Sequence, residues 1–101
     1  MAVKSVVLYP QPEDKAEFDR RYAEEHEPLC ASNLPRMKQL NKIRVLGSPQ
    51  GKPPYYLIVE LLYDSMDDLN ADFGSKEGGA VAKNAFAISS GGAPTILVTT
   101  A

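Results

Sequence analysis

The chain has 101 residues, of which 44% are hydrophobic and 24% are charged, and its formal net charge at pH 7 is −2. These values are typical of a soluble globular protein and predict one domain over residues 1–101. The weak negative charge without a basic cluster argues against nucleic acid binding, and the short apolar runs argue against a membrane span. We therefore expect a cytoplasmic protein with neither nucleic acid nor a membrane as a partner.

The first predicted elements are a strand and a long helix. β-Branched and aromatic residues favour a strand over Val3–Tyr9, which a proline-rich turn ends. Phe18, Tyr22 and Leu29 then recur at helical spacing on one face of a helix that begins near residue 13. The helix is expected to end before Pro35, because the residue preceding a proline avoids the helical conformation.

Two further strands are predicted in the middle of the chain. Residues 37–47 alternate as in a partly exposed strand, and a loop over residues 47–54 precedes Tyr55–Tyr63. This last strand, YYLIVELLY, has Glu60 as its one charge, so both of its faces are mostly apolar. Since helices on one side of the sheet leave the other side bare, we expect the bare face to meet a second subunit.

The remaining elements are a capped helix, a loose helix and a closing strand. Ser65 is a favourable N-cap for a helix that ends at Gly74, and residues 80–87 suggest a second, looser helix. The glycine-rich segment 74–93 is interpreted as either a mobile flap over a pocket or a plain surface connection. Residues 95–100 read as the final strand.

The element order is strand, helix, strand, strand, helix, strand. It predicts an α+β ferredoxin-like fold of the split βαβ type, with a four-stranded antiparallel sheet and the helices on one face. Two such sheets packed against each other would form a barrel-like homodimer.

A single cysteine and a single histidine restrict the chemistry. One cysteine excludes an intramolecular disulfide, and Cys30 with His26 cannot supply the ligands of a usual zinc site. No glycine-rich phosphate-binding motif follows a predicted strand. We therefore expect neither a metal nor an organic cofactor.

Three stretches carry a resemblance to a known family. With "YP" at the end of the first strand, "FDRRYAEEHEPL" on the first helix and "YDS" before the second, the chain resembles the EthD family of dimeric α+β barrel proteins. The resemblance implies a small homodimer with a pocket between sheet and helices in each subunit. Relatives on this fold include cofactor-independent monooxygenases, lactone isomerases and polyketide cyclases. One departure is "VAKNAF", where similar proteins are expected to have an acidic residue.

His26 is the candidate catalytic residue. It lies about 60° from the centre of the apolar helix stripe, which places it at a boundary between core and solvent. Pro28 is expected to kink the helix and to free the carbonyl of Glu24, which could then orient the imidazole. A satisfied boundary histidine without a functional role is the alternative.

The predicted strand directions place the second half of the first helix near the end of the third strand. We therefore predict a substrate-binding set around His26 that consists of Tyr22, Leu61, Tyr63, Asp64 and Phe86. A histidine with tyrosines in an apolar pocket can move a proton beside a carbonyl or phenol. The alternative is that Tyr22 and Tyr63 are core aromatics.

Two other residues have structural interpretations that we favour. Cys30 could be a nucleophile four residues from His26, but a lone cysteine beside Leu29 is more often a buried hydrophobe. Glu60 could be a buried acid, but Lys42 or Arg44 on the adjacent strand offers an ion pair.

Three functions remain open from the sequence. The first is a small homodimeric enzyme of the isomerase, cyclase or monooxygenase type, acting on an apolar ring or carbonyl compound with His26 as acid or base. The second is a non-catalytic binding or accessory protein for an apolar small molecule. The third is an assembly module that uses the sheet face and needs no pocket. Side chains that fill the space beside His26 would support it.

Overall fold

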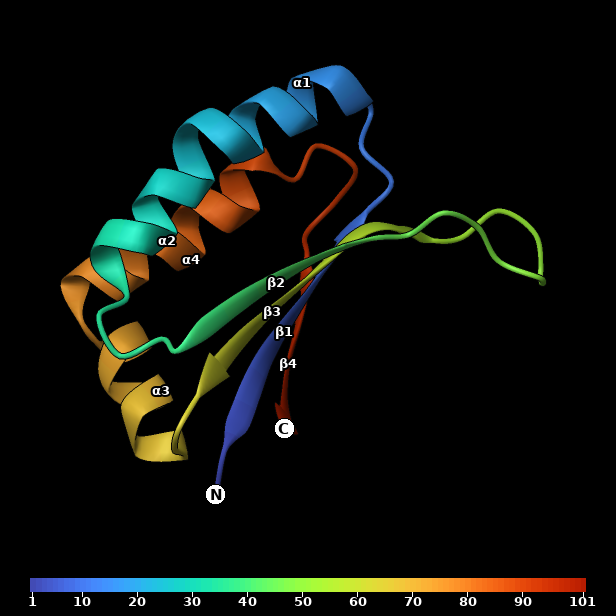
Figure 1. Ribbon diagram of the computed structural model, residues 1–101. Helices are drawn as coiled ribbons and strands as arrows, with labels where there is room; N and C mark the ends of the chain where they lie inside the picture. The colour runs from blue at the N-terminus through green and yellow to red at the C-terminus, as the bar shows by residue number, and fades with distance from the viewer.

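The computed structural model describes all residues, Met1–Ala101, and has a four-stranded sheet under a layer of helices (Figure 1). The strands are β1 (Val3–Pro10), β2 (Gln39–Arg44), β3 (Tyr55–Tyr63) and β4 (Thr95–Thr100), in the spatial order β2-β3-β1-β4. All three strand pairs are antiparallel. The predicted ferredoxin-like fold, with the helices on one face of the sheet, is therefore confirmed.

The strand register separates a buried sheet face from a bare one. Val7 lies opposite Val59 and Ser5 opposite Leu61, and these four side chains are buried beneath the helices. Alternation sends the side chains of Val6, Leu8, Ile58 and Leu62 to the other face, where they are only half-buried. The expectation that both faces of the third strand are apolar is correct.

The first helical segment contains a π-helical turn. It consists of α1 (Lys15–Arg21), the π turn η1 (Tyr22–His26) and α2 (Glu27–Asn33), and the Asp14 side chain caps its start by accepting from the Glu17 amide. The amide of Glu27 donates to the carbonyl of Tyr22, five residues earlier. The single kinked helix of the sequence prediction is therefore two α-helices joined by a π turn, as is common where an α-helical ladder is interrupted.

The π turn changes which residues face the core. Buried residues recur every fourth position along the segment, at Phe18, Tyr22, His26 and Cys30, and the pattern continues to Leu34 at its C-cap. A π turn rotates the chain less per residue than an α turn, so His26 comes back beneath the face that Tyr22 occupies. The predicted boundary position of His26 is therefore wrong: the residue is 5% exposed.

The second helical region is longer than its sequence suggests. Ser65 caps α3 (Met66–Gly74) as predicted, and Ser75 caps α4 (Lys76–Ile88), which includes Gly78 and Gly79. A side chain at Gly78 would overlap the carbonyl oxygen of Asp72 in α3. The expectation of a loose helix over residues 80–87 was too short, because the glycine that lowers helix propensity is needed where α3 and α4 approach each other.

No helix combines the length and the apolar character that crossing a membrane would require.

Candidate functional site

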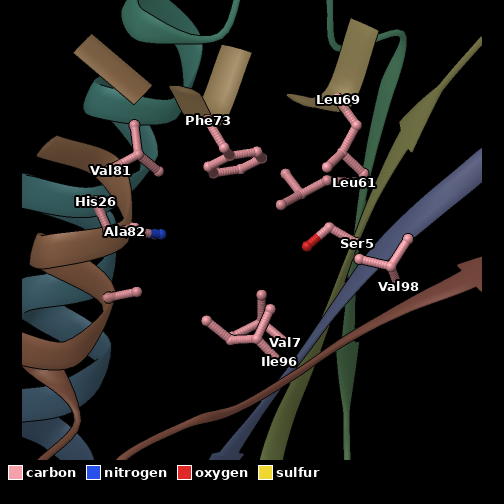
Figure 2. Close-up of a pocket in the computed structure, with 11 residues that line it drawn as sticks. Ser5, Val7, His26, Leu61, Leu69, Phe73, Val81, Ala82, Ile96 and Val98 are labelled. Carbon is pink, nitrogen blue, oxygen red and sulfur yellow. The ribbon is translucent and has the colours of Figure 1, made fainter. Parts of the chain in front are cut away.

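A cavity of about 260 Å³ lies between the sheet and the helices (Figure 2). The sheet contributes Ser5, Val7, Leu61, Ile96 and Val98. The helices contribute His26, Leu69, Phe73, Val81, Ala82 and Ala85. None of the eleven lining residues carries a formal charge with the imidazole neutral, so the cavity suits an uncharged, mostly apolar molecule.

His26 is the titratable group in this lining. Its ring packs against the ring of Tyr22, with 5.3 Å between centroids, and its Nδ1 lies 2.9 Å from Oδ1 of Asn84. Nε2 has no hydrogen-bond partner in the protein, and Figure 2 shows a ring nitrogen at the edge of the cavity. Burial lowers the pKa of His26, against smaller opposing effects of the Asn84 hydrogen bond and the Glu27 charge. The imidazole is therefore neutral at pH 7 and can accept a proton from a bound molecule.

The residue that orients His26 differs from the one predicted. We expected the carbonyl of Glu24 to do so, whereas the Asn84 side chain of α4 holds Nδ1. Asn84 belongs to the "VAKNAF" stretch, which the sequence marked only as a departure from similar proteins. Its proximity to His26 arises from the packing of α4 against η1, which no local pattern reveals.

Ser5 is a cavity residue that the sequence interpretation missed. It is 5% exposed and lies opposite Leu61 in the register, on the same sheet face as Val7. Figure 2 shows its hydroxyl pointing into the cavity. A polar residue at an inward position of an otherwise apolar strand was the available signal.

Of the predicted substrate-binding residues, Leu61 lines the cavity with His26. Tyr22 and Tyr63 are buried outside the lining. The Tyr22 hydroxyl has no hydrogen-bond partner, and the Tyr63 hydroxyl donates to Asp72 at 3.0 Å. Burial raises the pKa of both tyrosines, which keeps their hydroxyls protonated at neutral pH.

The other two predicted residues lie on the surface. Asp64 is exposed and forms an ion pair with Lys38 at 3.4 Å. Phe86 is 51% exposed, and neither residue lines the cavity. The structure thus brings His26 and Leu61 together at the cavity and leaves the other four predicted residues outside it.

Cys30 and Glu60, for which we favoured structural roles, lie away from the cavity lining. Cys30 is buried, and burial raises the pKa of its thiol to about 11, which fits a packing role. Glu60 pairs with Lys4 of β1 at 3.4 Å, not with Lys42 or Arg44 of β2. Those two side chains extend from the opposite sheet face, where they pair with Glu27 and Asp19 at 3.2 Å each.

Solved structures of distant sequence share the fold. A dimeric ferredoxin-like protein of unknown function from Jannaschia sp. CCS1 is 14% identical, with a TM-score of 0.74 and complete coverage of both chains. SnoaB, a cofactor-independent oxygenase from Streptomyces nogalater, is 14% identical with a TM-score of 0.70, over 99% of this chain and 92% of that one. At these identities the similarity shows the fold alone.

Closer relatives show the family. An EthD family protein from Bacillus halodurans C-125 is 35% identical, with a TM-score of 0.91 over 100% of this chain and 99% of that one. An uncharacterized 11.0 kDa protein of the thcB–thcC intergenic region of Rhodococcus erythropolis is 32% identical over 87 residues, which are 85% of this chain and 82% of that protein. The EthD domain model matches residues 10–85. This chain therefore belongs to the EthD family.

Proposed function

We propose that this EthD protein binds an apolar small molecule in the cavity and transfers a proton to or from it through His26. The observation that carries the proposal is a neutral, buried imidazole whose Nε2 is unpartnered beside a cavity without charged side chains. In such a site bulk water does not screen the interaction between the base and a bound molecule. Proton transfer by the base needs no metal or organic cofactor.

The chemistry would involve a weakly acidic O–H or C–H group of the bound molecule. His26 Nε2 would take the proton of a phenol, or of a carbon next to a carbonyl, and return it in a later step. The Ser5 hydroxyl enters the cavity from the sheet and could donate a hydrogen bond to the resulting oxyanion. The fold similarity to a cofactor-independent oxygenase is consistent with chemistry of this kind.

The test is turnover by the purified protein before and after substitution of His26. Native mass spectrometry of the protein from its source would identify what occupies the cavity, and that compound would be the assay substrate. We expect His26→Gln to lower kcat by about a hundredfold or more, the usual contribution of a general acid or base. Undiminished turnover by a folded His26→Gln protein would remove His26 from the mechanism.

The second candidate is a non-catalytic binding or accessory protein for the same class of molecule. It is favoured by the lining itself, in which nine of eleven residues are hydrophobic. A ligand that binds wild-type protein and is recovered unchanged after long incubation would support this candidate. The assembly-only alternative would be supported by side chains that fill the space beside His26, and a cavity lies there instead.

We also propose a homodimer formed through the bare sheet face, and a cytoplasmic location. Ile43 and Leu97 lie on this face, on β2 and β4, and are 42% and 50% exposed. With the half-buried Val6, Leu8 and Ile58 between them, they form an apolar surface across all four strands. The protein of the same fold from Jannaschia is described as dimeric, which supports a homodimer here.

A further inference from the structure

Asn84 lies between His26 and a charged pair on the first helical segment. Its Oδ1 is 2.9 Å from His26 Nδ1, and its Nδ2 donates to Oε1 of Glu25 at 3.3 Å. Glu25 is in turn held by Arg21, through Nε at 2.9 Å and Nη2 at 3.1 Å. Four side chains from η1, α1 and α4 thus form one continuous hydrogen-bonded chain that ends at the cavity.

The direction of each hydrogen bond in this chain follows from the groups themselves. An ionised carboxylate only accepts, so the amide nitrogen of Asn84 must face Glu25 and the amide oxygen must face His26. A carbonyl oxygen also only accepts, so the His26 nitrogen that faces it, Nδ1, must carry the hydrogen. In the neutral ring the remaining nitrogen, Nε2, then has a lone pair and no hydrogen.

We propose that Asn84 is a positioning residue that fixes His26 in the Nδ1–H tautomer, so that Nε2 accepts a hydrogen bond in the cavity and selects uncharged ligands that donate one, such as a phenol or an enol. Neutral histidine in water favours the opposite tautomer, so this state requires the Asn84 contact. The uncharged lining gives a carboxylate or phosphate ligand no cation to pair with.

The groups around His26 agree with a neutral ring. Glu27, on its own segment, favours the charged form and is outweighed by burial. Asn84 faces it from α4, the Tyr22 ring packs against it, and the sheet side of the cavity presents Ser5. Asn84 offers a neutral acceptor where an aspartate would add a negative charge and favour the imidazolium.

The tautomer can be measured directly because the chain has one histidine. Two-dimensional NMR that correlates the ring carbon-bound protons with both ring nitrogens distinguishes a protonated from an unprotonated nitrogen. We expect an unprotonated Nε2 in neutral, ligand-free wild-type protein. A predominant Nε2–H form in wild-type protein would overturn the proposal.

Substitutions then assign the effect to Asn84. Asn84→Leu keeps the approximate shape but removes the acceptor, so the Nε2–H form should become predominant. Asn84→Asp keeps the acceptor, so it should retain the Nδ1–H tautomer in the neutral ring and raise the pKa of His26 by about one unit or more. Glu25→Ala should shift the tautomer ratio towards that of Asn84→Leu. Glu24 is adjacent in sequence but pairs with Arg20, so Glu24→Ala should leave the ratio unchanged. Unchanged tautomers in both the Asn84→Leu and Glu25→Ala proteins would overturn the proposal.

The ligand class has its own test, and it rests on the proposed function insofar as the cavity is the binding site. The probes are p-cresol and its methyl ether, which have similar apolar bodies but differ in the ability to donate a hydrogen bond. Wild-type protein should bind p-cresol about tenfold more tightly, the contribution of roughly one hydrogen bond, and Asn84→Leu should lose this preference. Equal binding of the two probes to wild type would overturn the ligand selection. Undiminished turnover by the His26→Gln protein would refute the proposed proton transfer but leave the tautomer measured in wild-type protein unaffected, so the two failures are distinguishable.

Discussion

The hydroxyl of Tyr63 donates a hydrogen bond to the carboxylate of Asp72, whose side chain is 0% exposed. Arg36 contacts the same carboxylate twice, through its backbone amide at 3.0 Å and its Nη1 at 3.2 Å. This buried acid therefore joins β3, the α2–β2 connection and α3 beside the cavity wall.

The first prediction concerns Asp72. Asp72→Ala should lower the free energy of unfolding by about 3 kcal/mol, because it leaves the Tyr63 hydroxyl and the Arg36 amide without their partner. Tyr63→Phe should cost only about 1 kcal/mol, since the carboxylate keeps its Arg36 contacts. Urea unfolding measures both, and an Asp72→Ala protein as stable as Tyr63→Phe would contradict the linking role.

The second prediction compares two adjacent glycines of α4. Gly78→Ala should destabilise the protein by about 1–3 kcal/mol, because the new methyl group overlaps the backbone of Asp72. Gly79→Ala should stabilise it by about 0.5–1 kcal/mol, since nothing lies near that position and alanine favours the helix. The midpoint temperatures of thermal unfolding should therefore shift in opposite directions for the two variants. A shift in the same direction would refute the close α3–α4 contact.

The third prediction tests the cavity by filling it. Ala82→Leu places a larger side chain at the cavity wall and should weaken binding of p-cresol or of a co-purified ligand at least about tenfold. Ala80→Leu, at an exposed position on the same helix, is the matched control. Isothermal titration calorimetry measures both, and equal affinities would place the ligand elsewhere.

The fourth prediction tests the bare sheet face. Ile58→Lys puts a charge at the centre of that face, between Leu8 and Ile43, and should convert the dimer to a monomer at micromolar concentration. Leu46→Lys makes the same kind of exchange in the β2–β3 loop, where the side chain is 95% exposed, and should leave the dimer intact. Sedimentation velocity measures the oligomeric state of all three proteins. A monomeric wild-type protein would already disprove the proposed homodimer.

The fifth prediction concerns stability against pH. Because burial lowers the pKa of His26 in the folded state, the unfolded chain binds the proton more readily. The contribution of His26 to the free energy of unfolding is therefore fully present above the unfolded pKa of about 6.5. It is lost as the pH drops towards the folded pKa, by at most about 1.4 kcal/mol per pH unit. His26→Gln removes this contribution, so the stability of the variant should depend less on pH as the pH falls below about 6.5 in urea unfolding. Parallel curves for both proteins would show that His26 is not desolvated.

Local patterns were sufficient for most of the secondary structure. The run of apolar and aromatic residues in Tyr55–Tyr63 predicted the third strand with its observed bounds, and Ser65 predicted the start of α3. Both features depend on residues close in sequence, through strand propensity and helix capping. Gly78 misled the same reasoning, because glycine is required there by the close approach of α3 and not by a local preference.

For this protein, the sequence alone determined the order of elements, the apolar second sheet face and the family resemblance, since all three follow from short-range periodicity and motif spacing. The tertiary structure decided the site. A π turn rotated His26 inward, α4 brought Asn84 to its ring, and the sheet register turned Ser5 into the cavity. Contacts between segments about 60 residues apart depend on how whole elements pack, so a linear pattern of residues cannot specify them.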